Sequence, residues 1–326
     1  MSESSPTIRA VVDIGTNSVK LLVAETSEDG VTPLHEDSEQ TRLGRGLYES
    51  GLLAPEALSD TAKVLEDFAA DAKRRGASSI RVVATSAARD AKNGDELAAI
   101  VKQATRAELE IISGDQEAEW VYRGVSSQAG VSTGPLLVSD VGGGSTELIL
   151  GNAGVCQFAR SFKLGTVRQL EQTQLSYTPG DLELSRSLET IGAFLKQNVV
   201  SPIANALAAL DHPIESIIGV GGTTTFLARI QLATEAFDRD QIEATQFTRN
   251  ELQSLTERMW NMSLEERRNL PGLPSNRADV ILFGAAIYLS LMTELGLNQL
   301  AVSTRGVRFG ALIQQEKSQI KAAART

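Results

Sequence analysis

Ser139–Leu148 reads SDVGGGSTEL, in which an aspartate precedes three consecutive glycines and a β-prone apolar run follows them. Three glycines together lose much backbone freedom on folding, so the stretch needs a compensating role. A second stretch, VDIGTNSVKLLVA from Val12 to Ala24, aligns with it without a gap. An offset of this size indicates a duplicated domain rather than a short solenoid repeat. The matched pairs, each 127 positions apart, are Asp13 and Asp140, Gly15 and Gly142, Ser18 and Ser145, and Leu21 and Leu148.

Both copies predict a β-hairpin whose tight turn has an aspartate before it and a hydroxyl group at its end. Glycine-rich turns let successive backbone N–H groups point into one concave nest, and such nests bind anionic oxygens. Ordinary glycine-rich turns are the alternative, but the in-register repetition of Asp, Gly and Ser argues against it. We therefore expect two phosphate-binding loops, formed by Gly15, Thr16, Asn17 and Ser18 in the first copy and by Gly142, Gly143, Gly144 and Ser145 in the second.

Asp13 and Asp140 each stand just before one of these loops. A carboxylate repels phosphate, so its presence beside a phosphate nest implies an intervening hard cation, most simply Mg²⁺. Two such hairpins, one in each domain, would face each other across a cleft and bind one phosphate chain from both sides. The duplication therefore predicts a metal-assisted phosphate site.

Length and composition are typical of a two-domain globular protein, because 326 residues with 42% hydrophobic and 22% charged residues exceed the usual size of one core. Cys156 is the only cysteine, which excludes a disulfide framework and favours a reducing cytoplasm. The net charge of −10 argues against binding nucleic acid through the general field of the protein. No apolar run approaches the roughly 18 residues of a membrane span, so we expect a cytoplasmic protein without a membrane partner.

The remaining chain alternates predicted strands and helices, which favours an α/β fold. In the first half, an amphipathic helix is expected from about Pro55 to a terminating Gly76. In the second half, residues 180 to about 210 are expected to be helical, with a break near Pro202. The expected domains are residues 1–125 and 126–326, with a last helix from 306 to about 324 that could pack back on the first domain.

Seven sequence blocks occur in order across nearly the whole chain: VDIGTNSVKLLVAE, ATSAARDAKN, ISGDQEAEWVYRGV, SDVGGGSTELIL, SFKLGTVR, IGVGGTTT and NRADVILFGAAI. Together they resemble the exopolyphosphatase / guanosine pentaphosphate phosphohydrolase (Ppx/GppA) family. That family belongs to the superfamily of acetate kinase, sugar kinases, heat-shock proteins and actin. The resemblance is to the short, two-domain members, and it implies two duplicated actin-like (ribonuclease H-like) domains with a cleft between them.

The resemblance implies a role for each matching residue. Glu117 matches the catalytic glutamate that orients or deprotonates the attacking water, and a carboxylate at the start of a helix suits a general base. Arg89 matches an arginine that binds a phosphoryl oxygen, a task that suits a guanidinium. Asp140 and Glu147 match acidic positions near the metal, to which the duplication adds Asp13. A glycine turn that is used near the nucleotide elsewhere in the superfamily is matched by Gly221, Gly222 and Thr223.

The chain departs from the family pattern on the catalytic helix. The family commonly has Glu-Glu-Ala-Arg there, where this chain has Gln116, Glu117, Ala118 and Glu119. Glu117 and Glu119 are about 200° apart around a helix, so only one of them can face the site. Lys163 stands where a proline or small residue is frequent, and it adds a cation.

The implied function is that of an exopolyphosphatase with Mg²⁺ or Mn²⁺ as cofactor, acting as a homodimer on inorganic polyphosphate. Removal of the 5′ γ-phosphate of guanosine pentaphosphate is an alternative with the same chemistry. A small-molecule kinase would need an adenosine pocket, for which the glycine turn is too short a signal. A non-catalytic sensor of phosphate or of a phosphorylated alarmone is the last alternative. Glu117 discriminates between these classes, because a binding module does not need a carboxylate aimed at the terminal phosphate.

Overall fold

The computed structural model describes residues 6–27, 30–128, 131, 134–210 and 213–323. The chain divides into two compact units: unit 1 is Met1–Ala129 with Arg305–Thr326, and unit 2 is Gly130–Thr304. The division therefore falls later than the expected boundary after residue 125, and the last helix belongs to unit 1. None of the helices in the described ranges has the length and apolar character that crossing a membrane requires.

Unit 1 is built on a mixed sheet with the strand order β3-β2-β1-β4-β5. Neighbours within β1 to β3 pair antiparallel, whereas β4 pairs parallel with both β1 and β5. Consecutive residues Val11 and Val12 of the central strand are both fully buried, so this sheet is covered on both faces. The strands are β1 (Thr7–Ile14), β2 (Val19–Ser27), β3 (Gly30–Glu39), β4 (Ile80–Ala84) and β5 (Leu109–Ile111).

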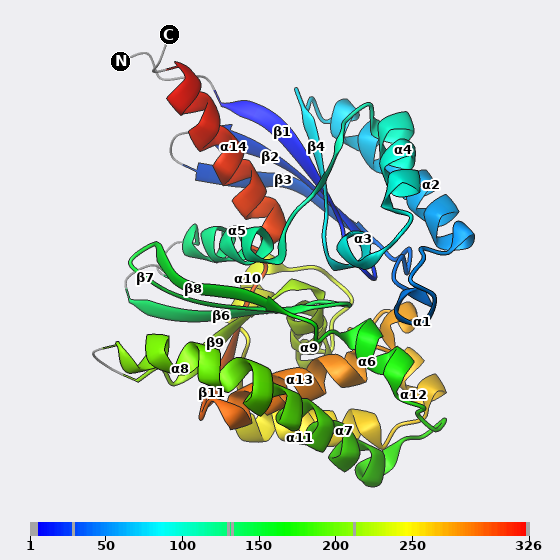
Figure 1. The fold of residues 1–326 in the computed structure, drawn as a ribbon, viewed down its shortest axis with the longest axis vertical. Helices are drawn as coiled ribbons and strands as arrows, with labels where there is room; N and C mark the ends of the chain where they lie inside the picture. The colour runs from blue at the N-terminus through cyan, green and yellow to red at the C-terminus, as the bar shows by residue number, and fades with distance from the viewer. Residues whose placement is uncertain (1–5, 28–29, 129–130, 132–133, 211–212, 324–326) are drawn as a thin grey trace. The chain divides into compact units, whose positions relative to one another are not determined.

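The helices of unit 1 cover this sheet. The predicted amphipathic helix is confirmed as α2, which begins at Pro55 and ends before Gly76, a residue with positive φ. It packs against α4 and contacts β1 and β2, while α14 contacts β1, β2, β3 and α5. Figure 1 shows α2 and α4 side by side and α14 running along the strands. The helices are α1 (Leu47–Ser50), α2 (Pro55–Arg74), α3 (Ser86–Asp90), α4 (Gly94–Thr105), α5 (Gly114–Ser126) and α14 (Val307–Ala323).

Unit 2 repeats the plan of unit 1. Its strand order is β10-β11-β9-β6-β7-β8, so β8, β7, β6, β9 and β11 follow the same order as β3, β2, β1, β4 and β5. The pairings also match, because β6, β7 and β8 pair antiparallel while β9 pairs parallel with β6 and β11. Both predicted hairpins and the duplication are thus confirmed. The strands are β6 (Pro135–Val141), β7 (Thr146–Asn152), β8 (Val155–Phe162), β9 (Ser216–Val220), β10 (Gln246–Thr248) and β11 (Gln299–Ser303).

The helices of unit 2 pack around a large apolar core in which α7, α11 and α13 contact one another. The break expected near Pro202 is wrong. The chain stays helical through a π-helical segment, Lys196–Val200, which continues directly into α8, where Pro202 is the second residue. The helices are α6 (Thr166–Gln172), α7 (Gly180–Leu195), α8 (Ser201–Ala208), α9 (Gly221–Leu232), α10 (Arg239–Ala244), α11 (Arg249–Trp260), α12 (Leu264–Arg268) and α13 (Ile281–Glu294).

Two glycines bring α5 and α14 together within unit 1. A Cβ atom added at Gly124 of α5 would lie 2.5 Å from the carbonyl oxygen of Gly306. A Cβ added at Gly310 of α14 would overlap the backbone carbonyl of Trp120. The backbones of the two helices therefore approach as closely as glycine allows, which fixes α5, the helix that carries Glu117.

We expect Gly310→Ala to lower the free energy of unfolding by at least about 2 kcal/mol, because the added methyl must push the two backbones apart. Urea denaturation followed by circular dichroism measures the change. Gly134→Ala is the matched control, since nothing lies within 4 Å of a Cβ there, and it should stay within about 0.5 kcal/mol of the wild type. An equally stable Gly310→Ala variant would contradict the close packing.

Candidate active site

The first glycine loop, Gly15–Ser18, closes the hairpin between β1 and β2. The N–H of Gly15 donates to the carbonyl of Ser18 at 2.9 Å. The carbonyl of Thr16 accepts from the N–H of Gly44 at 2.7 Å, and that of Asn17 accepts from the N–H of Arg42 at 3.1 Å. A segment after β3 therefore holds two carbonyl oxygens of the loop on one side.

The second loop, Gly142–Ser145, has the same turn, because the N–H of Gly142 donates to the carbonyl of Ser145 at 3.0 Å. Its carbonyls are held by the start of α6. Thr166 donates its N–H to Gly142 at 2.9 Å, and Val167 donates its N–H to Gly143 at 2.8 Å. The Nε of Arg168 donates to the carbonyl of Gly144 at 2.9 Å.

The orientation of these carbonyls determines where the loop N–H groups point. In a trans peptide the C=O and the following N–H point in opposite directions. The N–H groups of Gly143, Gly144 and Ser145 therefore point away from α6, to one common side. In unit 1 the N–H groups of Asn17 and Ser18 point away from the segment that holds the first loop. This geometry supports the prediction of two anion-binding nests.

Glu117 lies in the first turn of α5 and is only 6% exposed. Its Oε2 accepts from Nη1 of Arg89 at 2.7 Å. The same Nη1 donates to the carbonyl of Ile112 at 3.0 Å, so Arg89 is anchored to the end of β5 as well. The sequence predicted Arg89 as a ligand of phosphate. The structure gives this arginine a second task, which is to hold the carboxylate of Glu117 in one place.

The departure from the family pattern at Glu119 does not disturb Glu117. Glu119 forms an ion pair with Arg123 one turn further along α5, at 2.5 Å, and its side chain is 46% exposed. Gln116 donates its backbone N–H to the N-cap residue Ser113. The prediction that Glu117 and Glu119 face different sides of the helix is confirmed.

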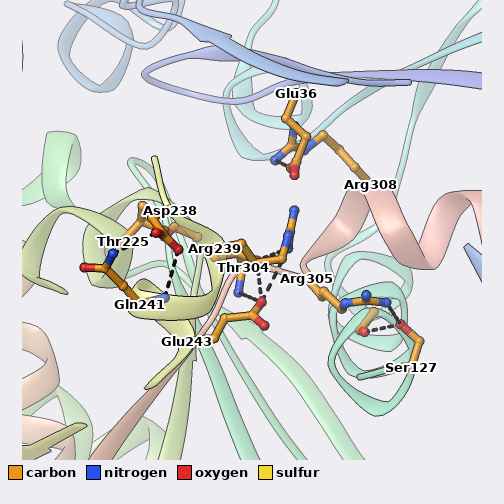
Figure 2. Close-up of polar contacts among 12 residues, drawn as sticks. Glu36, Ser127, Thr225, Asp238, Arg239, Gln241, Glu243, Thr304, Arg305 and Arg308 are labelled. Carbon is orange, nitrogen blue, oxygen red and sulfur yellow. Dashed lines mark hydrogen bonds and ion pairs between the residues drawn. The ribbon is translucent and has the colours of Figure 1, made fainter. Parts of the chain in front are cut away.

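Asp13 is buried in unit 1, and its Oδ1 has no hydrogen-bond partner among the described residues. Burial raises the pKa of Asp13, although the positive charges of Lys20, Arg308 and Arg89 oppose this. Arg308 is itself paired with Glu36 at 3.0 Å (Figure 2). A buried carboxylate oxygen without a donor is costly unless something binds it. This orphaned oxygen fits a site for a cation or for a ligand that carries one.

The two aspartates of the repeat have different neighbours across the hairpin. Asp13 pairs in register with Lys20, whereas Asp140 pairs with Glu147. Glu147 is 1% exposed, and its Oε1 accepts from the hydroxyl of Ser161 at 2.6 Å. Like charges directly opposite each other destabilise a sheet, so the Asp140–Glu147 pair suggests a cation beside the two carboxylates.

A divalent cation fits the donor set of unit 2. No group of three or more His, Cys, Asp and Glu side chains that could hold a metal occurs in the part of the chain that the structure describes. Mg²⁺ does not need such a group, because it is usually bound by one or two carboxylates together with water and substrate phosphates. Asp140 and Glu147 supply two hard oxygen donors on neighbouring positions of paired strands.

The glycine turn after β9 lies against Asp140. Gly221 has a φ of 87°, and a Cβ atom there would overlap the carboxylate of Asp140. Gly222 has more space, since a Cβ atom added there would lie 3.6 Å from its nearest neighbour, a ring carbon of Phe226. Thr223 donates its hydroxyl to the carbonyl of Val141 at 2.8 Å. The turn predicted to bind phosphate therefore also makes room for the carboxylate.

Several site residues were missed by the sequence analysis. Gly165 is one of them, because a Cβ there would lie 2.5 Å from Gly143 and Gly144. Tyr288 of α13 is another: its hydroxyl donates to the carbonyl of Ser139 at 3.0 Å, and burial raises the pKa of this phenol far above its usual value. Gly165 stood within the block SFKLGTVR, which was its only local signal. Tyr288 lies in an apolar helix, and no local feature of the sequence marked it as a site residue.

Known proteins resemble this chain in sequence and in fold. The model of the Ppx/GppA phosphatase family matches residues 22–319. Exopolyphosphatase 2 of Mycobacterium tuberculosis is 32% identical over 317 residues, which cover 92% of this chain and 96% of that protein. The crystal structure of the Aquifex aeolicus member of the Ppx/GppA family superposes with a TM-score of 0.78 at 26% identity and covers 97% of this chain and 99% of its own. An exopolyphosphatase from Cytophaga hutchinsonii has the same fold, with a TM-score of 0.84 at 23% identity over 96% of this chain and 98% of its own.

Proposed function

Because the chain belongs to the Ppx/GppA phosphatase family, we propose that it is an exopolyphosphatase that releases terminal orthophosphate from inorganic polyphosphate. The observation that carries the proposal is the buried carboxylate of Glu117, held by Arg89 at 2.7 Å. A sensor that only binds phosphate has no need of such a group. The name of the M. tuberculosis relative supports polyphosphate as the substrate.

In the proposed reaction, Glu117 accepts a proton from a water molecule as the water oxygen attacks the terminal phosphorus. A new P–O bond forms to this oxygen, and the bond to the bridging oxygen breaks. The products are orthophosphate and a chain that is one unit shorter. No covalent enzyme intermediate is required, because positioning and electrostatics supply most of the acceleration in phosphoryl transfer.

Each glycine loop is proposed to bind phosphate oxygens through its N–H groups: those of Asn17 and Ser18 in unit 1, and those of Gly143, Gly144 and Ser145 in unit 2. Backbone donors that are fixed in advance stabilise the charge that spreads over the phosphoryl oxygens in the transition state. The bracing of the loop carbonyls supports this role, since it keeps the donors oriented before substrate binds.

Asp140 and Glu147 would hold a metal in unit 2, and Asp13 would supply an oxygen donor to a metal in unit 1. A bound Mg²⁺ or Mn²⁺ would neutralise phosphoryl charge and act as a Lewis acid. The protein has a net charge of −10, which repels a polyanion, so local positive charge at the site is needed for binding. The proposal also includes a homodimer. It further includes a cytoplasmic location, because a single cysteine is compatible with a reducing compartment.

A second candidate is the removal of the 5′ γ-phosphate of guanosine pentaphosphate. The family description covers both activities in its name, and the chemistry at the terminal phosphate is the same. The two candidates differ only in what lies beyond the phosphates that the loops contact.

The deciding experiment is phosphate release by the purified full chain with Mg²⁺. Short polyphosphate, long polyphosphate, guanosine pentaphosphate and ATP are offered side by side. Faster release from polyphosphate than from the nucleotides supports the proposal, and the reverse ratio supports the second candidate. A folded protein that releases phosphate from none of the four would leave only a phosphate-binding role.

We expect Arg89→Met to lower kcat by roughly 10- to 100-fold, since Glu117 loses the group that orients it. The acid limb of the pH–rate profile should move to higher pH, because removing a neighbouring cation favours the protonated carboxyl. Arg89→Lys should restore part of the rate. Arg74→Met, which removes a surface arginine paired with Asp71, is the control and should behave as the wild type. An unchanged profile for Arg89→Met would show that Arg89 does not act on Glu117.

A further inference from the structure

The backbone on each side of Asp140 is held by a side-chain hydroxyl group. The carbonyl of Ser139 accepts from the hydroxyl of Tyr288 at 3.0 Å. The carbonyl of Val141 accepts from the hydroxyl of Thr223 at 2.8 Å. Asp140 therefore sits between two peptide groups that are both fixed from outside the strand.

The two hydroxyls come from helices that are distant in the sequence. Tyr288 belongs to α13 and Thr223 to α9, and each reaches β6 where a glycine lets it approach. A Cβ at Gly219 would lie 3.1 Å from the Tyr288 ring, and a Cβ at Gly284 would lie 2.5 Å from the methyl group of Thr223. The hydroxyl of Tyr288 also lies 3.4 Å from the carbonyl of Val220, the residue before Gly221. One phenol thus contacts both β6 and β9 beside Asp140.

In unit 1, the carbonyl equivalent to that of Val141 is held by a backbone group instead of a side chain. Ile14 is the repeat equivalent of Val141, and its carbonyl accepts from the backbone N–H of Thr85 at 3.2 Å. Unit 2 uses a side chain where unit 1 uses the main chain. In unit 2, a contact that supports the backbone beside Asp140 is therefore made by a group that a conservative substitution can remove.

The Tyr288 hydroxyl is not needed for packing alone. Tyr288 is fully buried, and a phenylalanine would fill almost the same volume without a polar group to satisfy. A buried hydroxyl that donates to carbonyls next to a carboxylate matches the arrangement of groups that orient metal ligands from outside the first coordination sphere.

We propose that Tyr288 and Thr223 are positioning residues that fix the backbone at Asp140, so that its carboxylate and that of Glu147 meet a divalent cation. This inference rests on the proposed function only for its effect on catalysis, because the effect on metal binding can be measured without substrate. Neither residue needs to touch the metal or the phosphate to have this effect.

The test compares Tyr288→Phe, Thr223→Val and the double variant with the wild type. Binding of Mn²⁺ alone is measured by titration with detection of free Mn²⁺ by electron paramagnetic resonance. Each single variant is expected to weaken Mn²⁺ binding about 10-fold, as loss of such supporting groups does in other metal sites. Thr223→Ser keeps the hydroxyl and should restore binding.

In the activity assay, the variants should need about 10-fold more Mg²⁺ for half-maximal phosphate release. For Tyr288→Phe, which lies outside the predicted phosphate-binding residues, the KM for polyphosphate at saturating Mg²⁺ should be unchanged. Thr256→Val is the matched control, because it removes a buried hydroxyl of the same unit that donates to Leu252 within its own helix at 2.7 Å. It should alter stability without altering the affinity for Mn²⁺.

Folded Tyr288→Phe and Thr223→Val variants whose Mn²⁺ affinity stays within twofold of the wild type would overturn the inference. A wild-type protein that does not bind Mn²⁺ would overturn it as well. If the wild type releases no phosphate from any substrate while the variants still bind Mn²⁺ more weakly, the proposed function fails and the positioning role stands. If the wild type is an active hydrolase and the variants bind Mn²⁺ normally, the positioning role fails and the proposed function stands.

Discussion

Glu117→Gln is expected to lower the rate of phosphate release from polyphosphate by at least about 100-fold, the usual contribution of a general base. The amide has nearly the same size as the carboxyl group but cannot accept the proton of the attacking water. The fold should be retained, because the amide oxygen of glutamine can still accept from Nη1 of Arg89. The measurement is kcat for orthophosphate release at saturating polyphosphate and Mg²⁺.

Glu119→Gln is the matched control for this prediction. It makes the same chemical change two residues further along α5, where the side chain is half-exposed and paired with Arg123. Its rate should stay within about twofold of the wild type, as expected for a surface ion pair of little energetic weight. If Glu117→Gln retains wild-type activity, another residue must activate the water. The buried carboxylate of Glu117 would then no longer support the proposed function.

Asp13→Asn is expected to have two effects of opposite sign. Activity should fall on the order of 100-fold, because a charged oxygen donor for the metal is lost. Stability should rise by about 1 kcal/mol, because a buried carboxylate with an unpartnered oxygen is replaced by a neutral group. Its raised pKa supports this sign, since it shows that the cost of burial exceeds the attraction of Lys20, Arg308 and Arg89.

The stabilisation should depend on pH. Below the unfolded-state pKa of about 3.8, Asp13 is protonated in both states, and the variant gains little from losing the charge. As the pH rises towards the folded-state pKa, the unfolded chain ionises first, so the wild type loses stability relative to Asp13→Asn. Above the folded-state pKa the difference is constant.

Chemical denaturation at a series of pH values measures this difference. Asp60→Asn on the surface of α2 is the control, because the side chain of Asp60 is 61% exposed, and it should stay within about 0.5 kcal/mol of the wild type. A less stable Asp13→Asn variant with full activity would mean that Asp13 has a structural partner rather than a role in the site.

The local signals in the sequence were sufficient for the hairpins and for the duplication. Glycine and hydroxyl residues at fixed offsets predict a tight turn, and β-prone apolar runs predict strands on each side, because both depend on neighbours within a few positions. The amphipathic helix from Pro55 follows for the same reason. The shared strand order of the two sheets could not be predicted in this way, because it depends on pairing between segments that are distant in the chain.

At Pro202 the tertiary structure differs from what the local sequence predicts. Proline removes a donor and usually ends a helix. Here the preceding residues Lys196–Val200 take a π-helical spacing, and Val199 and Ile203, on either side of Pro202, are buried in the core of unit 2. Burial of these apolar side chains favours the helical path of the segment.

By itself, the sequence determined which residues could do chemistry: two aspartates, two glycine loops and one glutamate at the start of a helix. Only the tertiary structure decided what surrounds each of them. The repeat makes Asp13 and Asp140 equivalent, yet Arg89 and Arg308 lie near Asp13, whereas the buried Tyr288 of α13 lies near Asp140. Arg89 reaches Glu117 from a separate helix. The contact between Arg89 and Glu117, like the charges of Arg89 and Arg308 near Asp13, joins segments that are distant in the sequence. The free energy of a charged group depends on such contacts, which its sequence neighbours do not reveal.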